Sequence, residues 1–289
     1  MFKKSTTLLF VATLMTIRAA EAALGPETAA QMQYHYDTTA SDCGGPAEPA
    51  HHCSGLLLRA TKPSPNYHTW HHSPNSREKG GVSFTYLRAD LPITALAADA
   101  RSGFSLHPHM ERPRGSLAYQ VLCNWPTDGD TWTRDRQGCG DNSTTTDNER
   151  FCHEQGIDTA QAWIEHFRRT GDYKQQCAFD GRQTRGNERA DSFAQALAVQ
   201  RQYASELPFP WNEVIVQAWD EEQSQHLPIQ SFFHVEGLSG ALEQAQADQK
   251  DWYATYGTYV PIIRLKLPND AEEKARFSYH PEEQAVPAS

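Results

Sequence analysis

Six cysteines, all placed after an apolar N-terminal leader, constrain the fold of this chain more than any other feature. They are Cys43, Cys53, Cys123, Cys139, Cys152 and Cys177. An even number of cysteines in an exported chain is typical of a disulfide framework, so we expect three disulfides. Spacing does not choose the pairing, and on proximity alone we expect Cys43 with Cys53, Cys139 with Cys152, and Cys123 with Cys177. The chain has no C-x-x-C pair, which disfavours a zinc site or a catalytic thiol.

The leader occupies residues 1–22. A basic start is followed by an apolar run from Leu8 to Ile17, and Ala20-Glu21-Ala22 has the small-x-small pattern of a cleavage site. An apolar run of this length is too short to span a membrane. We therefore expect a signal peptide whose removal leaves residues 23–289 as a single secreted domain, extracellular or periplasmic, without membrane insertion.

The charge balance excludes some partners. The chain carries a net charge of −10 at pH 7, and removing the leader takes away more basic than acidic residues. Nucleic acids and anionic lipid surfaces bind basic fields, so we expect neither as a partner. A small anionic ligand in a local basic pocket stays compatible with this balance. No linker or repeat divides the chain, and we expect one domain that acts as a monomer.

Hydrophobic periodicity predicts a mixed α+β domain with mainly antiparallel sheets. Helices are expected over 26–33, 159–169, 190–207 and 238–256, with Asp158 or Thr159 as N-cap and Gly171 after the end of the second. Strands are expected over 55–59, 82–87, 103–107, 117–123, 212–219, 229–235 and 259–267. We expect residues 125–150 to form a long surface loop and the residues after 267 to form a polar tail.

Two of these strands and the irregular loop between them suggest a binding site. The first strand ends in Arg59, and the second alternates apolar and hydroxyl residues through Ser83 and Thr85. The connecting loop carries Tyr67, His68, Trp70, His71 and His72. An arginine beside hydroxyl groups and aromatic rings suits an anionic, planar ligand. The alternative is an ordinary sheet with a surface arginine.

Three residue types now stand in a notable order. Arg59, the Ser83-Phe84-Thr85 triplet and Glu213 follow one another, each on an expected strand. This order resembles the Arg-Ser-Glu class of ADP-ribosyltransferases. The wider sequence is similar to the halovibrin type of secreted bacterial protein, over most of the mature chain and including all six cysteines. The segments that carry this second resemblance are 53–61, 80–90, 177–180, 212–213, 228–233 and 261–268.

The resemblance implies an ADP-ribosyltransferase-like fold that cleaves NAD, as substrate, at the nicotinamide–ribose bond and passes ADP-ribose to water or to a protein acceptor. Glu213 would then face the positive charge that develops on the ribose. Ser83 would position that carboxylate, and Arg59 would bind a phosphate or ribose oxygen. The other candidates for binding NAD are Thr61, Trp70, Phe84 and Thr85, with Trp70, Tyr67 or Phe84 as the ring that stacks on nicotinamide. No metal is expected to take part.

One position departs from the pattern of the class. Members that modify arginine usually carry Glu or Gln two residues before the catalytic glutamate, and here Trp211 stands at that position. This favours water, or an unfamiliar acceptor, as the end point. We therefore predict NAD glycohydrolysis first and protein ADP-ribosylation second.

Two other functional classes stay open. In a secreted, disulfide-stapled binding protein without catalysis, Arg59 would be an ion-pair partner of Asp90 or of another of the many acidic residues, and Glu213 would be a solvated strand end. In a metalloenzyme, the histidines at 51–52, 68–72 and 107–109 would supply ligands, although no H-E-x-x-H motif occurs. Nicotinamide release and metal analysis separate these classes.

Overall fold

The structure is a computed structural model that describes residues 24–74, 76, 81–97, 100–108, 119–131, 139, 151–182, 189–217, 227–270 and 273–287. The expected leader over 1–22 and most of the expected loop over 125–150 lie outside these ranges. Within them, no helix is both long and apolar enough to cross a membrane.

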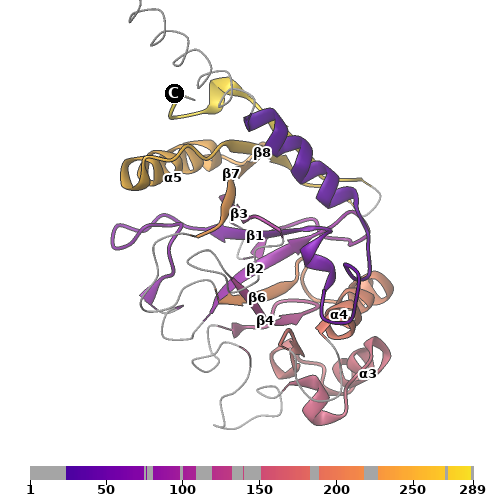
Figure 1. Cartoon of the computed structure of the whole chain (residues 1–289). Coiled ribbons are helices and arrows are strands. Elements are labelled where there is room, and N and C mark those ends of the chain that lie inside the picture. The colour runs from indigo at the N-terminus through magenta and orange to yellow at the C-terminus, as the bar shows by residue number, and fades with distance from the viewer. Residues whose placement is uncertain are drawn as a thin grey trace, which may run out of the picture.

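A nine-stranded sheet forms the centre of the described part, in the order β5-β4-β6-β2-β1-β3-β7-β8-β9 (Figure 1). The strands are β1 (Leu56–Thr61), β2 (Val82–Leu87), β3 (Ser102–Leu106), β4 (Gln120–Trp125), β5 (Phe179–Asp180), β6 (Glu213–Gln217), β7 (Ile229–Val235), β8 (Ile262–Lys266) and β9 (Arg276–Tyr279). Among these strands only β7 and β8 pair in parallel. The expected α+β class with mainly antiparallel strands is therefore confirmed.

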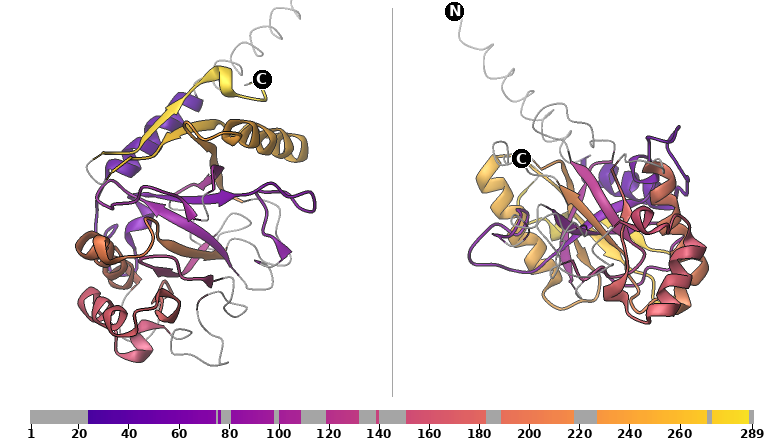
Figure 2. Two further views of the ribbon diagram at one scale, coloured as in Figure 1. Left: turned by 180° about the vertical axis from the view of Figure 1, so that it is seen from behind. Right: turned by 90° about the horizontal axis from the view of Figure 1, so that it is seen from below.

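The helices pack at the two ends of this sheet. They are a helix over 24–37, α3 (Ala160–Thr170), α4 (Arg189–Tyr203) and α5 (Ala241–Tyr256). Helix α5 lies against β7 and β3, whereas α3 packs on α4, which covers β5 and β4. Figure 2 shows from two sides that α5 and the α3–α4 pair lie at opposite ends of the molecule. The described segments between these elements also contain short 3-10 helices: η1 (Ala50–His52), η5 (Cys152–Gln155), η6 (Tyr173–Gln175), η7 (Ala204–Glu206) and η8 (Pro281–Glu283).

Helix α3 illustrates how local sequence sets an element's bounds. The Thr159 hydroxyl accepts a hydrogen bond from the Ala162 N–H at 3.1 Å, which satisfies a donor in the first turn. Gly171 ends the helix with φ of 66°, a left-handed conformation that glycine adopts without strain. Trp163 and Ile164 lie on the buried face. The expected N-cap and end of the helix are both confirmed.

The main core lies between the sheet and α5. Phe84 of β2 and Phe104 of β3 place their ring centres 5.9 Å apart, and Phe232 of β7 lies 6.4 Å from Trp252 of α5. All four rings are less than a tenth exposed. Aromatic rings bury large apolar areas, so this layer holds the sheet rigid beneath the polar face.

Strand β2 changes partner halfway along its length. Residues 82–84 pair with β6, whereas residues 85–87 pair with β1. Beyond that point β1 continues through residues 59–61 alongside β3 only. The two halves of the sheet therefore separate beside β2, and we call this opening the fork.

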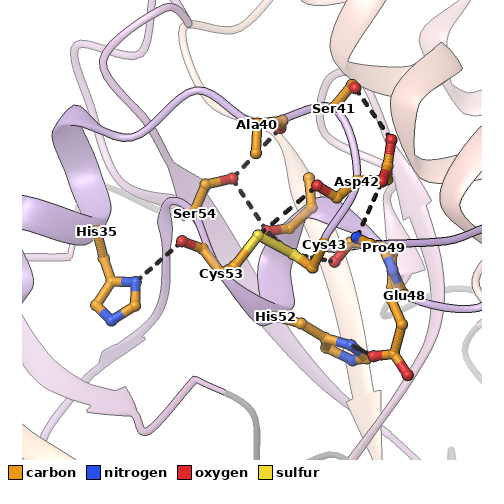
Figure 3. Close-up of a disulfide and its surroundings, with 12 residues drawn as sticks. His35, Ala40, Ser41, Asp42, Cys43, Glu48, Pro49, His52, Cys53 and Ser54 are labelled. Atoms are coloured by element: carbon orange, nitrogen blue, oxygen red, sulfur yellow. Dashed lines mark hydrogen bonds and ion pairs between the residues drawn. A yellow bond between two sulfur atoms is a disulfide. The ribbon is translucent and has the colours of Figure 1, made fainter.

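One of the three expected disulfides is confirmed, and the other two were paired wrongly. Cys43–Cys53 closes the short loop ahead of β1 (Figure 3). The remaining bonds are Cys123–Cys139 and Cys152–Cys177. The chain doubles back through α3, so that the Cys152 N–H donates to the Ala178 carbonyl oxygen at 2.9 Å. This backbone contact places Cys152 beside Cys177, a neighbour that distance along the sequence cannot reveal.

The expected polar tail is also wrong, because it contains β9 and η8. The alternation in β9 is short, and only Phe277 of its residues is fully buried. The helix over 24–37 covers this edge, where the side chain of Gln33 bonds to the backbones of Phe277 and Ala275 at 3.1 and 3.4 Å. Contacts from the other end of the chain therefore hold a strand that its own sequence only weakly favours.

Candidate functional site

A pocket of about 400 Å³ opens at the fork, a size within the range of small-ligand sites. Arg59 lines it from β1, Ser83 and Thr85 line it from β2, and Glu213 lines it from β6. The three residues predicted to carry the chemistry thus come together, although more than 150 positions of sequence separate the first from the last. Because β2 lies between β1 and β6, the arginine and the glutamate stand on opposite sides of the hydroxyl residues.

Glu213 is the most buried charged residue of the pocket lining. It begins β6 between β4 and β2 and is 5% exposed, so it is not a solvated strand end. The Gly129 N–H donates to its Oε2 at 2.8 Å, and the Thr131 hydroxyl donates to its Oε1 at 2.6 Å. Both of these donors are uncharged. Among the described residues, uncharged donors therefore fix the carboxylate in position.

The loop after β4 is shaped to reach this carboxylate. A Cβ at Gly129 would stand 2.6 Å from the Trp125 ring and 2.9 Å from Glu213 Oε2, so a larger residue would displace one of them. The turn is completed by Asp128, whose Oδ1 accepts a hydrogen bond from the Asp130 N–H at 2.8 Å. Asp130 has φ of 51°, a left-handed conformation in which Asp and Asn are enriched. The Asp-Gly-Asp sequence thus forms a tight turn over Glu213.

Asn212 holds the start of β6 against β2. Its Oδ1 accepts from the Tyr86 N–H at 2.7 Å, and its Nδ2 donates to the Tyr86 carbonyl oxygen at 2.8 Å and to Gln200 Oε1 at 3.0 Å. The Asn212 side chain therefore continues the pairing with β2 just ahead of the first residue of β6. Because Glu213 is the next residue, these bonds also fix the place from which its carboxylate enters the pocket.

Burial raises the pKa of the Glu213 carboxyl group, and the negative charge of Asp128 raises it further. Hydrogen bonds from Thr131, Ser83 and Gly129 to the ionised form lower this pKa only in part. A poorly solvated carboxylate interacts strongly with any positive charge that develops nearby. Such a group is suited to stabilise a cationic transition state.

Arg59 lies across the fork from Glu213. Its Nη1 donates to the Ser83 carbonyl oxygen at 2.7 Å, in the region where β1 no longer pairs with β2. Burial lowers the pKa of the guanidinium, while the charges of Glu213 and Tyr67 raise it in part. Lys62, three residues further along the chain, also lines the pocket. The pocket thus has a cationic wall on the β1 side and an anionic wall on the β6 side.

Three of the residues predicted to bind the ligand lie elsewhere. The Thr61 hydroxyl donates to the Ser102 carbonyl oxygen at 3.4 Å, and Phe84 belongs to the main core. Trp70 is 2% exposed, and its indole N–H donates to Asp251 of α5 at 2.9 Å. None of the three is part of the pocket lining. Phe84 follows Ser83, and successive strand residues point to opposite faces of a sheet.

Among the described residues, two aromatic side chains line the pocket. Tyr67 is 37% exposed and was one of three rings considered for stacking on nicotinamide. Trp211 also lines the pocket, at the position where arginine-modifying enzymes usually carry Glu or Gln. Its ring centre lies 4.6 Å from that of Phe209, which lies 5.0 Å from that of Tyr173. An aromatic series therefore leads from the pocket to η6.

The sequence analysis missed five polar residues of the pocket lining: Lys62, Ser73, Ser76, Asp128 and Thr131. The last two lie within the stretch that was expected to be only a surface loop. The Asp-Gly-Asp run was a turn signal, but a turn does not specify which strand it folds over. The pairing of β4 with β6 decides that the turn stands above Glu213.

The structure contradicts the ion pair suggested for a binding protein without catalysis. Asp90 accepts hydrogen bonds from Arg88 Nε at 2.6 Å and from Arg201 Nη1 at 3.0 Å. Burial raises the pKa of Asp90, but these two guanidinium groups lower it below its ordinary value. Asp90 is therefore bonded to other cations, and Arg59 is directed to the pocket instead.

The histidines considered as metal ligands lie in different places. His51 packs its ring 4.8 Å from that of Phe193, whereas His68 Nδ1 lies 2.5 Å from Asp251 Oδ2. His109 lies outside the described residues. In the part of the chain that the structure describes, no group of three His, Cys, Asp or Glu residues comes together as a metal site.

The pocket side chains can act together on a ligand that carries both signs of charge. The guanidinium of Arg59 offers a planar donor fork on the β1 side of the pocket, and the carboxylate of Glu213 offers a buried negative charge on the β6 side. Comparison with models of known protein families and with curated proteins finds no match for the chain.

Proposed function

We propose that this protein is an exported enzyme that cleaves the nicotinamide–ribose bond of NAD, as an NAD glycohydrolase first and a protein ADP-ribosyltransferase second. One observation carries the proposal. The buried carboxylate of Glu213, which accepts hydrogen bonds from uncharged donors, lies in the same pocket as Arg59 and Ser83. Their placement on three neighbouring strands agrees with the Arg-Ser-Glu order in the sequence. That agreement supports an ADP-ribosyltransferase type of fold.

The charge distribution of the pocket suits NAD. Arg59 and Lys62 lie on the β1 side, whereas Glu213 and Asp128 lie on the β6 side. NAD has a cationic nicotinamide ring joined through ribose to an anionic pyrophosphate. The pyrophosphate would bind on the β1 side through charge-assisted hydrogen bonds, which directs the nicotinamide ribose toward the glutamate.

Each residue then has a defined task in bond cleavage. As nicotinamide departs with the bonding electron pair, positive charge moves from its ring to the ribose. Glu213 accepts a hydrogen bond from a ribose hydroxyl and stabilises the positive charge, an interaction strongest in the transition state. Ser83 supports the ionised carboxylate by donating to it. Tyr67, the exposed ring of the lining, is placed to stack on a planar group.

Trp211 supports water as the main acceptor. Its indole occupies the part of the lining where a side chain that bonds to an acceptor arginine would be expected. An indole can donate one hydrogen bond but cannot accept one from a guanidinium, so arginine recognition is disfavoured. Export is supported by three disulfides, which persist in oxidising compartments.

The test is nicotinamide release from NAD by the oxidised chain without residues 1–22, with and without protein acceptors. We expect release by the wild type and its loss in Glu213→Gln. The matched control is Glu206→Gln, because Glu206 is a surface residue paired with Arg168 at 2.7 Å. Release that does not increase with added protein indicates hydrolysis. A correctly disulfide-bonded wild type that releases none would overturn the proposal and leave a secreted binding protein as the better description.

A further inference from the structure

A second pocket opens where β3 begins and where β7 and β8 end. Its volume is about 450 Å³, within the range of small-ligand sites. Arg101 directly precedes β3, Val235 ends β7 and Lys266 ends β8, and all three line this pocket. The Val235 N–H donates to the Arg101 carbonyl oxygen at 2.8 Å, and Val235 pairs with Leu265 of β8. Strand pairing thus brings the three segments side by side, and we call the opening the strand-end pocket.

The inner part of the strand-end pocket is apolar. Leu96, Ala100 and Val235 line it and are each less than a tenth exposed. Leu238, in the turn after β7, also lines the pocket and is 43% exposed. A single exposed leucine is common on protein surfaces, but this one extends a buried apolar lining toward solvent. The pocket therefore suits a ligand with an apolar body.

The charged residues of this lining favour an anion. Among the described residues the lining has two cations, Arg101 and Lys266, and one acid, Glu236. Glu236 Oε1 lies 3.6 Å from Arg264 Nη1, so a cation outside the lining balances it. Arg101 Nη1 donates to the Ser239 carbonyl oxygen at 2.8 Å, which uses one donor of a guanidinium that has five. Two cations gathered at one pocket, in a chain with a net charge of −10, create a local field that attracts negative charge.

We propose that the strand-end pocket binds an amphiphilic anion, a medium-chain fatty carboxylate. Its apolar chain packs on Leu96, Val235 and Leu238, and its carboxylate is bound by Arg101 and Lys266. A guanidinium can bind a carboxylate through two parallel hydrogen bonds, and an ammonium adds a compact positive charge. Burial of the chain supplies most of the binding free energy. Binding at this site does not depend on the proposed cleavage of NAD.

The strand-end pocket lies next to the pocket at the fork. Ala100 lines both of them. The pocket at the fork also has two cations, Arg59 and Lys62, to which a carboxylate can bind. Binding of a fatty carboxylate by the protein would therefore not by itself identify the pocket, and substitutions in each pocket are needed to tell the two apart.

The experiment is isothermal titration calorimetry of the oxidised chain without residues 1–22, with octanoate, hexanoate and octanol as probes. We expect octanoate to bind on the order of 10-fold more tightly than hexanoate, because two more methylene groups are buried. Octanol should bind at least about 10-fold more weakly than octanoate, because it cannot form charge-assisted hydrogen bonds.

The double variant Arg101→Gln with Lys266→Gln tests the anion site. Both side chains are exposed, so the substitutions should not disturb the fold. We expect the affinity for octanoate to fall at least about 10-fold and the affinity for octanol to stay unchanged. The matched control is Arg59→Gln, which removes a cation of the fork and should leave octanoate binding near wild type.

Leu238→Ser tests the apolar part of the site. It should weaken octanoate binding severalfold, because apolar surface that contacts the chain is lost. The matched control is Leu24→Ser, which changes a leucine of similar exposure, 38%, outside the pocket lining. This control should bind octanoate as the wild type does.

Three results would overturn the proposal: no octanoate binding by the correctly disulfide-bonded wild type, equal affinities for octanoate and octanol, or binding lost in Arg59→Gln but kept in the Arg101→Gln and Lys266→Gln double variant. Acetyl-leucine that binds more tightly than octanoate would also overturn it, and would assign the pocket to the C-terminus of a polypeptide. None of these outcomes depends on nicotinamide release, so the failure of this proposal and that of the proposed function are distinguishable.

Discussion

Two buried glutamates, one at the fork and one beside β7 and β8, have opposite electrostatic surroundings. Glu213 in the fork is 5% exposed, and Glu283 of η8 is 6% exposed. The Glu283 carboxylate lies 2.9 Å from His234 Nε2 and accepts from Arg264 Nε at 3.0 Å, while Glu213 is bonded to an amide and a hydroxyl. Burial raises the pKa of Glu283, but its hydrogen bonds with Arg264 and His234 lower it below the ordinary value; the pKa of Glu213 is raised.

The difference shows how the fold uses the same residue type for two purposes. At Glu283 the ionic bonds anchor the chain end after β9 to β7 and β8, so the charge contributes to stability. At Glu213 an ionised carboxylate disfavours folding, because its burial and the nearby charge of Asp128 raise its pKa. A costly charge beside an open pocket is typical of a functional group.

The largest effect is expected from Glu213→Gln. Nicotinamide release should fall at least about 100-fold, since a group that stabilises charge in the transition state is removed. Stability at pH 7 should be unchanged or increased, because the raised pKa of Glu213 means that its ionised form opposes folding above pH ~4.5. Thermal melts of both proteins at pH 4 and pH 7 check the sign: the difference should be present at pH 7 and small at pH 4. A variant that loses stability as well as activity would contradict the comparison.

The disulfide Cys123–Cys139 is expected to matter next, because it closes the loop that carries Gly129 and Thr131. Cys123→Ala with Cys139→Ala should lower stability by about 3 kcal/mol, as for other loops of this length. It should also reduce nicotinamide release from the folded fraction, since both donors to Glu213 lose their anchor.

The matched control for that variant is Cys43→Ala with Cys53→Ala, which opens the loop ahead of β1. Its stability should also fall by a few kcal/mol, but release by the folded fraction should stay near wild type. Equal activities in the two double variants, measured below their melting temperatures, would show that the Cys123–Cys139 bond does not organise the site.

Glu283→Gln tests the second glutamate of this comparison. We expect a loss of about 2 kcal/mol at pH 7, below the value for a fully buried pair because the side chain of Arg264 is 28% exposed. The lowered pKa of Glu283 means that this contribution is present above pH ~4.5 and disappears as pH falls through the pKa in the folded state. Urea unfolding at pH 7 and pH 3.5 measures it. Release of nicotinamide should not change. A large change would contradict the assignment of stability to Glu283 and of function to Glu213.

The smallest effect is expected from Asp248→Asn in α5. Asp248 accepts hydrogen bonds from the hydroxyl of Thr69 and from Gln244, and burial raises its pKa to about 6. The wild type should lose stability from this group as pH rises from ~4 through 6, and the variant should lack that loss. Asparagine keeps the acceptor, so we expect the variant and the wild type to differ by less than about 1 kcal/mol at pH 4, where the carboxyl group is mostly protonated. Melting temperatures measured across this pH range decide the matter.

The same asparagine substitution also tests how the pocket is built. Thr69 belongs to the chain between β1 and β2, whose Tyr67 lines the pocket. If that chain must be held by α5 for activity, KM for NAD should rise in Asp248→Ala, which loses the acceptor, and not in Asp248→Asn. Equal KM values in the two variants would show that the contact is not needed.

Local sequence predicted most of the elements. The helices α3, α4 and α5 and the strands β1, β2, β6 and β7 begin and end within a few residues of the expected bounds. Caps such as Thr159 and Gly171 act within one turn, so their effect is visible from neighbouring residues. The strand β9 was missed because contacts from residues 24–37 hold it in place.

The site was predicted only in part, because local signals identify strands but not the distant segments that pack on them. Arg59, Ser83 and Glu213 were found because each lies on a recognisable strand, and strand order then brings them together. Asp128 and Thr131 were missed because a turn signal does not say what the turn covers. Trp70 and Phe84 were assigned to the ligand, since an aromatic ring in a sequence gives no sign of which face it occupies.

The sequence by itself determined the class of the domain, the bounds of its main helices and strands, and the order of arginine, serine and glutamate along them. These properties depend on periodicity and capping, which act between residues close together in the chain. Only the tertiary structure decided that β2 changes partner to open a pocket, that Cys123 pairs with Cys139, and that the Asp128 turn closes over Glu213. Those outcomes depend on which distant segments pack together, a choice made by the free energy of the whole core and not by any local pattern.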